Sequence, residues 1–401
     1  MENNKTPSIR FKGFTDPWEQ RKLGDVIDFL DTLRKPLKET DREPGPYPYY
    51  GASGIVDHVA DYIFDEELIL LSEDGANITD RNYPVCFLAT GKYWVNNHAH
   101  VLKARNKMDN NFICMSMERK DYSNYNTGMA MPKLNKDTCC QIPVDCPTFE
   151  EQKKIGDYFR NLDNLITLHQ RKYNKLLNVK KSMLEKMFPK NGSNIPEIRF
   201  KGFTDPWEQR KLGDQMYIKS RIGWQALTKK EYLETGDYYL ITGTDIDEDK
   251  HIVDFNCCYY VSKERYEMDD KIQVYEGDII VTKDGTIGKV AMVTGLDKPA
   301  TLNSHLFVLR DLSGKLYNRF LLQVLVSHIF GDFVESTKTG STLTGLPQKT
   351  FVEFRFLMPE MVEQMKIAQY LDNLDNLITL HQRELEKLQY IKKSMLEKMF
   401  V

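Results

Sequence analysis

One stretch of seventeen residues occurs twice, without a single difference, in this chain of 401 residues. The segment IRFKGFTDPWEQRKLGD occupies Ile9–Asp25 and returns at Ile198–Asp214, 189 positions later (198 − 9). A shared fold alone would allow the exposed positions of two copies to drift apart. We therefore expect an internal duplication whose repeated surfaces serve the same purpose twice.

A second set of identical segments lies at the end of each half. NLDNLITLHQR at Asn161–Arg171 recurs at Asn373–Arg383, and KKSMLEKMF at Lys180–Phe188 recurs at Lys392–Phe400, both 212 positions later (373 − 161 and 392 − 180). Each half thus has a constant start, a divergent middle and a constant end. The second half carries 23 extra residues in its middle (212 − 189).

The divergent middles still resemble one another. LLSEDGANI (Leu70–Ile78) is similar to IVTKDGTIG (Ile280–Gly288), and NNHAHVLK (Asn96–Lys103) is similar to NSHLFVLR (Asn303–Arg310). Apolar runs that are closed by Asp-Gly turns are typical of strands. We expect two versions of one mixed domain with substantial β content.

The constant ends predict long helices. Apolar or bulky residues recur there at alternating steps of four and three, the heptad pattern of a coiled coil. A single helix with such a stripe is unstable in water, and the simplest partner for one stripe is the other. The expected antiparallel seam consists of Ile155, Phe159, Leu162, Ile166, His169, Tyr173, Leu176, Ile367, Leu371, Leu374, Ile378, His381, Leu385 and Leu388. Two histidines are too few ligands for a metal site, so the seam histidines are expected to set the register.

Composition narrows the class of protein. The chain begins with polar residues, has no apolar run long enough to cross a bilayer, and contains seven cysteines without a CxxC pair. We expect a reduced, cytoplasmic protein with no membrane partner and no metal. The net charge of −3 argues mildly against a simple electrostatic nucleic-acid binder, although a whole-chain sum can hide a basic face.

Motifs of catalysis are missing from the sequence. KDGTIGKV has Lys283 where a phosphate-binding loop needs its first glycine, and Val290 where it needs Ser or Thr. GxSxG, HExxH and the Asn-Pro-Pro-aromatic motif of amino-methyltransferases do not occur. No carboxylate stands at a meaningful spacing from His98, His100 or His305, so a hydrogen-bonding role is favoured over catalysis for these histidines. We expect no chemistry and no cofactor in this chain.

These residues resemble a known family, the specificity (S) subunits of type I restriction–modification systems. The resemblance covers nearly the whole chain and rests on FTDPWEQRKLGD at Phe14–Asp25 and Phe203–Asp214, PTFEEQKKI at Pro147–Ile155, PEMVEQMKI at Pro359–Ile367, and YPYYGASGI at Tyr47–Ile55. NLDNLITLHQR and KKSMLEKMF complete these signatures.

The resemblance implies an α+β fold. Two similar mixed α/β target recognition domains would be separated by two long helices that form an antiparallel coiled coil, with pseudo-two-fold symmetry. The expected boundaries are 1–147 for the first recognition domain, 148–189 for the first long helix, 190–358 for the second recognition domain and 359–401 for the second long helix.

The resemblance also implies a targeting subunit that is not itself an enzyme. Each recognition domain would read one half of a bipartite site in double-stranded DNA. The helices would set the spacing and dock two modification subunits, which bind S-adenosylmethionine and methylate adenine. Two restriction subunits, motor–nucleases that use ATP and Mg²⁺, would complete the endonuclease. The rival interpretation is a protein-binding scaffold with two variable domains on a coiled coil, and a third is a nuclease with a cryptic acidic site.

Base reading requires polar side chains on rigid loops that reach the edges of bases. The predicted DNA-binding residues are Lys92, Asn96, Asn97 and His98 in the first half and Asn303, Ser304 and His305 in the second, followed by Thr127 and Gly128 in the loop Thr127–Met131, and Thr339, Gly340 and Ser341 in the loop Thr339–Thr344. The alternative for each is a turn or a hydrogen bond at a strand end.

Four residues beside the seam are predicted to bind partner subunits: Tyr158, Leu165, Tyr370 and Leu377. For these four, packing within the chain itself is the alternative.

Overall fold

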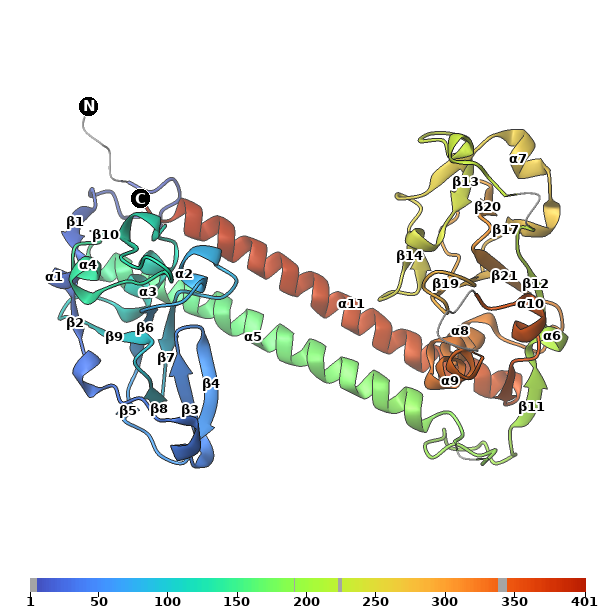
Figure 1. Cartoon of the computed structure of the whole chain (residues 1–401), viewed down its shortest axis with the longest axis horizontal. Helices are drawn as coiled ribbons and strands as arrows, with labels where there is room; N and C mark the ends of the chain where they lie inside the picture. The colour runs from blue at the N-terminus through green and yellow to red at the C-terminus, as the bar shows by residue number, and fades with distance from the viewer. Residues whose placement is uncertain (1–5, 191, 223–225, 338–344) are drawn as a thin grey trace. The chain divides into compact units, whose positions relative to one another are not determined.

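The structure is a computed structural model that describes residues 6–190, 192–222, 226–337 and 345–401. Contacts between residues divide the chain into two compact units. Unit 1 comprises Met1–Gln170 with Arg383–Val401, and unit 2 comprises Arg171–Gln382. Each unit includes part of two 38-residue helices, α5 (Phe149–Lys186) and α11 (Met361–Lys398) (Figure 1).

Unit 1 is built on a four-stranded sheet with the order β2-β9-β6-β7, another with the order β4-β3-β8-β5, and a pair β1-β10. Its strands are β1 (Glu19–Lys22), β2 (Ile27–Phe29), β3 (Pro44–Gly51), β4 (Gly54–Val59), β5 (Phe64–Asp65), β6 (Leu68–Ser72), β7 (Cys86–Ala89), β8 (Lys92–Val95), β9 (Ala99–Ala104) and β10 (Pro143–Cys146). Its shorter helices are α1 (Leu23–Val26), α2 (Asn77–Asp80), α3 (Asn110–Glu118) and α4 (Lys136–Cys140), with 3₁₀ turns η1 (Asp31–Leu33), η2 (Glu39–Asp41) and η3 (Ser123–Tyr125).

Strand β6 is buried on both faces, which explains its unbroken apolar sequence. Successive side chains of a strand point to opposite faces. Ile69 and Leu71 accordingly lie in a core cluster with residues of α3 and α5, whereas Leu68 and Leu70 lie in a cluster with residues of β8. The sheet of β6 is thus a layer between the helices and the second sheet.

Unit 2 contains a six-stranded sheet with the order β12-β21-β18-β19-β15-β14, a four-stranded sheet β16-β13-β20-β17 and a pair β11-β22. Its strands are β11 (Glu208–Lys211), β12 (Met216–Lys219), β13 (Tyr238–Ile241), β14 (Ile246–Asp247), β15 (Ile252–Val253), β16 (Tyr259–Val261), β17 (Gln273–Val274), β18 (Ile279–Thr282), β19 (Val290–Met292), β20 (Ala300–Leu302), β21 (Leu306–Asp311) and β22 (Arg355–Met358). Its shorter helices are α6 (Leu212–Gln215), α7 (Lys263–Glu267), α8 (Asn318–Val326), α9 (His328–Ser336) and α10 (Gln348–Phe351), with 3₁₀ turns η5 (Lys229–Glu231), η6 (Gly243–Asp245) and η7 (Asp270–Ile272).

The two units share one topology. The order β2-β9-β6-β7 corresponds to β12-β21-β18-β19, and β4-β3-β8-β5 corresponds to β16-β13-β20-β17. The pairs β3–β8 and β13–β20 are both parallel. The hairpin β14–β15 stands between β13 and β16, where unit 1 passes directly from β3 to β4, and it accounts for part of the extra length of the second half. The predicted α+β fold with two similar mixed domains and long helices is confirmed.

The two long helices begin in the same way. Their preceding residues include Pro147 and Pro359, and a proline favours a boundary at this point. The buried side chains of Gln152 and Gln364 donate from Nε2 to the carbonyl oxygens of these prolines, each at 2.9 Å. The glutamine repeated at both helix starts therefore fastens the first turn to the strand before it.

Within each unit the helices α5 and α11 run antiparallel. In unit 1 Phe159, near the start of α5, packs against Phe400 just after the end of α11, with ring centroids 5.9 Å apart. In unit 2 the roles are reversed, since Phe188 shares a core cluster with Ile367 and Leu371 of α11. Every predicted seam position on the two helices is buried or partly buried.

Lysines close to the seam form ion pairs between the helices. Lys392 Nζ lies 2.6 Å from Asp163 Oδ1 in unit 1, and Lys180 Nζ lies 2.5 Å from Asp375 Oδ1 in unit 2.

In the part of the chain that the structure describes, no helix is long and apolar enough to span a membrane. Among the same residues, no cluster of three His, Cys, Asp or Glu side chains is suited to hold a metal ion.

Candidate functional site

The same Asn-x-His turn precedes one strand of each unit. In unit 1 Asn96 Oδ1 accepts a hydrogen bond from the backbone N–H of His98 at 2.8 Å. In unit 2 Asn303 Oδ1 accepts from the backbone N–H of His305 at 3.0 Å. Both asparagines are buried, with exposed fractions of 7% and 5%, so their side chains support the turn instead of facing solvent.

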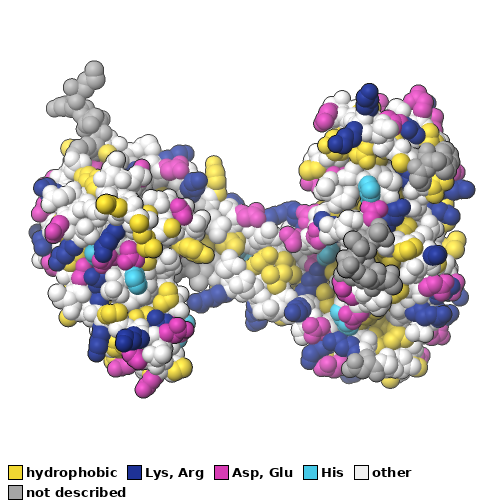
Figure 2. Space-filling view, viewed as in Figure 1, with side chains coloured by type: hydrophobic (Ala, Val, Ile, Leu, Met, Phe, Trp, Pro, Cys, Tyr) yellow, Lys and Arg dark blue, Asp and Glu magenta, His cyan; other side chains and the backbone are white. Residues whose placement is uncertain are grey.

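Each of these histidines contacts an aspartate from the neighbouring strand end. His98 Nδ1 lies 2.9 Å from both carboxylate oxygens of Asp74, and His305 Nδ1 contacts Asp284. The histidine side chains remain 53% and 58% exposed. On the face shown in Figure 2, histidine side chains of each unit lie beside acidic ones. The expectation that no carboxylate partners these histidines was wrong, because the fold joins residues 24 and 21 positions apart.

Backbone hydrogen bonds make the two His–Asp arrangements equivalent. The carbonyl oxygen of His98 accepts from the N–H of Glu73 at 2.8 Å, and that of His305 accepts from the N–H of Lys283 at 2.9 Å. The residue before each aspartate is therefore tied to the histidine opposite it. These bonds continue the antiparallel pairs β6–β9 and β18–β21.

The loop Thr127–Met131 of the first half packs beside the Asn-x-His turn of unit 1. The N–H of Gly75 donates to the carbonyl oxygen of Pro132 at 3.0 Å, and Thr127 N–H donates to Lys133 O at 2.8 Å. Gly128 N–H donates to Asn126 Oδ1 at 2.9 Å. Thr127 and Gly128 thus belong to a loop that lies beside Asp74 and His98. In unit 2 Leu346 N–H donates to Lys283 O, whereas the predicted Thr339, Gly340 and Ser341 lie outside the described residues.

The remaining predicted residues of these segments differ in position. Asn97 is exposed and Ser304 is partly exposed, each between the asparagine and the histidine of its turn. Lys92 begins β8 at the end opposite the turn, and its Nζ lies 4.5 Å from the ring centroid of Tyr62. The fold therefore separates Lys92 from the other predicted residues of the first half.

A buried network that sequence reasoning missed supports the turn of unit 1. His100 Nδ1 lies 2.7 Å from Asp31 Oδ2, while its Nε2 lies 2.7 Å from the carbonyl oxygen of Leu134. Arg34 Nη1 donates to Glu73 Oε2 at 2.7 Å. Burial raises the pKa of the Asp31 carboxyl, but the hydrogen bond and charge of His100, the Val101 N–H and the charge of Arg34 together hold that pKa below its ordinary value. No local pattern joins residues so far apart.

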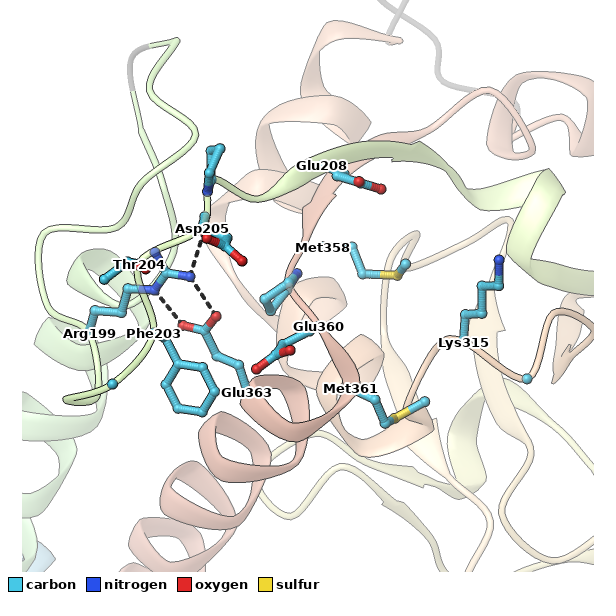
Figure 3. Close-up of a pocket in the computed structure, with 14 residues that line it drawn as sticks. Arg199, Phe203, Thr204, Asp205, Glu208, Lys315, Met358, Glu360, Met361 and Glu363 are labelled. Carbon is cyan, nitrogen blue, oxygen red and sulfur yellow. Dashed lines mark hydrogen bonds and ion pairs between the residues drawn. The ribbon is translucent and has the colours of Figure 1, made fainter.

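The repeated segment is clamped to the start of a long helix in each unit. Arg10 Nε and Nη2 donate to the two carboxylate oxygens of Glu151 at 2.6 and 2.8 Å. Arg199 makes the same bidentate contact with Glu363 at 2.7 and 2.8 Å (Figure 3). Both carboxylates are buried. The hydrogen bond to the glutamate raises the pKa of each guanidinium.

A cleft lies beside each clamp. In unit 2 it has a volume of about 470 Å³ and lies between the repeated segment and the start of α11, with Phe203, Glu360 and Met361 in its lining (Figure 3). A cleft of unit 1 is lined by Pro17, Glu19 and Phe149, whose counterparts Pro206, Glu208 and Met361 line the cleft of unit 2. The proline and the first glutamate of the repeated segment thus line a cleft in both units.

The four residues predicted to bind partners fall into two groups. Tyr158 and Tyr370 are partly buried and meet Phe11 and Phe200 edge to face, with centroids 6.1 and 6.0 Å apart. They pack against the repeated segment of their own chain. Leu165 and Leu377 are exposed, as are Leu168 and Leu380 one turn further along each helix.

One family model and several known proteins resemble this chain in sequence. The family model described as the type I restriction modification DNA specificity domain matches residues 15–178 and again 204–390. A Haemophilus influenzae protein named S.HindORF215P is 25% identical over 395 residues, covering 94% of this chain and 92% of that protein. The type I restriction enzyme MjaVIII specificity subunit of Methanocaldococcus jannaschii is 24% identical over 412 residues, covering 95% and 91%.

A solved structure shares the fold. The crystal structure of the S subunit of a type I restriction–modification system from M. genitalium superposes with a TM-score of 0.64 at 15% identity, covering 99% of each chain. Because the family model matches both halves and covers most of the sequence, the chain belongs to the type I restriction–modification DNA specificity family.

Proposed function

We propose that this chain is the targeting subunit of a type I restriction–modification complex in which each unit reads one half of a bipartite site in double-stranded DNA. One observation carries this proposal. The two units share a topology and an equivalent Asn-x-His turn with its aspartate, yet the side chains around that turn differ. Two domains of one fold with different exposed side chains suit two half-sites of different sequence.

The helices supply a fixed spacer in this proposal. DNA presents the same groove face once per turn, about 34–36 Å apart, so two domains that read separated segments need a defined distance between them. The ion pair Lys392–Asp163 in unit 1 and the ion pair Lys180–Asp375 in unit 2 join α5 to α11 in the same way. A helix pair of fixed register would keep the gap between the half-sites constant.

The repeated surfaces would dock two copies of one partner. Leu165 and Leu168 on α5 and Leu377 and Leu380 on α11 are exposed apolar pairs within identical segments. Identical surfaces suit identical partners. These would be two modification subunits that carry S-adenosylmethionine and methylate adenine. Two restriction subunits using ATP and Mg²⁺ would complete the nuclease, and this chain would supply targeting without catalysis.

The rival function is a scaffold whose variable units bind proteins. Charged side chains of both signs are interspersed on the face shown in Figure 2, which fits a protein partner as well as DNA. Family membership favours DNA. Binding to duplex DNA that depends on both sequence and salt separates the two functions.

The test is a genome-wide map of methylated bases by long-read sequencing, in cells with this gene intact and with it deleted. We expect deletion to remove one motif of two short blocks around a fixed gap, with a methylated adenine in each block. An unchanged map, with the modification subunit verifiably expressed, would contradict the targeting function and favour the scaffold.

A further inference from the structure

The His–Asp arrangement is retained in two units that differ around it. Glu73 precedes Asp74 where Lys283 precedes Asp284, and Ala99 follows His98 where Leu306 follows His305. The divergent middles of the two halves therefore differ in the charge and size of these adjacent side chains, but both contain the histidine and the aspartate. A group kept in both units suits a feature that both half-sites share, not one that distinguishes them.

The geometry leaves one edge of each imidazole ring exposed. Nδ1 of His98 and of His305 contacts an aspartate, while neither Nε2 makes a hydrogen bond to any residue in the described ranges. Both side chains are more than half exposed. The unoccupied nitrogen of each ring therefore remains available for a ligand.

The aspartate determines what that edge offers. A carboxylate at Nδ1 orients the ring so that Nε2 faces away from the aspartate, and Nε2–H is a donor when both ring nitrogens carry a proton. The backbone N–H groups of Glu73 and Lys283 donate to the carbonyl oxygens of His98 and His305, which keeps the backbone of each aspartate beside its histidine. In that form the outward Nε2–H suits an anionic oxygen acceptor.

Phosphate is the anionic acceptor common to every DNA sequence. Contacts to phosphate position a protein on the duplex, whereas contacts to base edges carry specificity. We propose that His98 and His305, each oriented by its aspartate, donate from Nε2 to a phosphate oxygen of the DNA backbone, one contact in each half-site. This inference rests on the proposed DNA-reading function and changes the role of these two histidines from base reading to positioning on the backbone.

The test uses the full chain assembled with its modification subunits and two duplexes of equal length. One duplex carries the bipartite motif found by methylation mapping, and the other has a random sequence. We expect His98→Ala and His305→Ala each to weaken binding to both duplexes by about ten-fold, as for the loss of one charge-assisted hydrogen bond. The ratio of the two affinities should stay unchanged. His58→Ala, an exposed histidine elsewhere in unit 1, is the matched control and should bind like the parent chain.

Two further measurements separate this contact from a structural role. Replacing single phosphates of the motif duplex by neutral methylphosphonates should weaken binding by the parent chain at one position in each half-site, and should cause no additional loss at that position for the matching alanine variant. Asp74→Asn keeps an acceptor for Nδ1–H and should lose less affinity than Asp74→Ala, while both retain the thermal unfolding midpoint to within a few degrees.

Each contrary outcome has a distinct meaning. Weaker binding to the motif duplex alone would overturn the phosphate contact in favour of base reading. Unchanged binding to both duplexes by both histidine variants would overturn the contact altogether. A parent assembly that shows no preference for the motif duplex would contradict the proposed function itself, independently of the histidines.

Discussion

Lys392 on α11 lies 2.6 Å from Asp163 on α5 in unit 1, and Lys180 on α5 lies 2.5 Å from Asp375 on α11 in unit 2. Both lysines and both aspartates are 212 positions apart (392 − 180 and 375 − 163). The two helices therefore meet through the same pair of side chains twice, once in each unit.

Reversing the charge at one of these pairs should destabilise the chain. Lys180→Glu places a carboxylate against the partly buried Asp375, and we expect the free energy of unfolding to fall by about 1 kcal/mol. The double variant with Asp375→Lys should recover most of this loss. Urea unfolding followed by circular dichroism measures both. Lys190→Glu, at an exposed pair with Glu185, is the control and should change stability little.

Removing the arginine that pairs with the buried glutamate at a helix start should destabilise the chain more than the charge reversal does. Arg10→Leu leaves the buried carboxylate of Glu151 without its bidentate partner, so we expect a loss of about 3–5 kcal/mol in unfolding free energy. Arg21→Leu removes an exposed pair with Glu19 and should cost about 0.5 kcal/mol or less. Thermal and chemical unfolding measure both losses. If the two variants lost equal stability, the buried ion pair would contribute no more than the exposed one.

The network around Asp31 should make stability depend on pH in the acid range. The folded pKa of Asp31 lies below its ordinary value of 3.8, so its contribution is present above that value and is lost as pH falls toward the folded pKa. Asp31→Asn should therefore destabilise the chain at pH 7 and flatten the decline in stability below about pH 4. Unfolding measured from pH 7 to pH 3 tests this, and parallel curves for the two proteins would refute it.

One position of the repeat leaves little space for a side chain in unit 1. A Cβ on Gly156 would lie 2.4 Å from Asp109 Oδ1, which already accepts a hydrogen bond from the Phe112 N–H. We expect Gly156→Ala to cost about 1–3 kcal/mol through crowding in the core. The equivalent residue of the second copy is Ala368, and Ala368→Gly serves as the reciprocal variant. Stabilisation by Gly156→Ala in thermal melts would show that α3 moves to accept the methyl group.

The exposed leucines should matter for assembly and not for stability. Leu165→Asp and Leu377→Asp alter surface side chains of α5 and α11, so each should change unfolding free energy by about 0.5 kcal/mol or less. Under the proposed function, each single variant should bind one modification subunit in place of two, and the double variant should bind neither. Mass measurement of the assembled complex distinguishes these states. Full assembly by the double variant would place the docking surface elsewhere.

Much of the architecture was predictable because repeats and periodicity are properties of the chain itself. Identical segments indicated two equivalent halves, and the four-three spacing from Ile155 to Leu176 indicated which helix face would be covered. The unbroken apolar run of β6 followed from burial on both faces. These patterns depend on neighbours along one element, so no knowledge of distant residues was needed.

The candidate site depended on residues that are distant in sequence. His98 and Asp74 were visible in two similar segments, but their contact forms only when β6 and β9 pair. The same holds for His100, whose partner Asp31 is 69 positions away. Asn96 was predicted to face DNA, whereas the turn directs its side chain inward. The identity of a polar residue does not specify which side of a turn its side chain occupies.

The sequence by itself determined the duplication, the mixed domains, the heptad helices and the family, because identical segments and local spacing depend only on the order of residues along the chain. Only the tertiary structure decided that Lys180 would meet Asp375, that Arg10 would hold a buried Glu151, and that an aspartate would orient each exposed histidine. Such contacts depend on strand register and helix packing, where a displacement of one residue exchanges every partner.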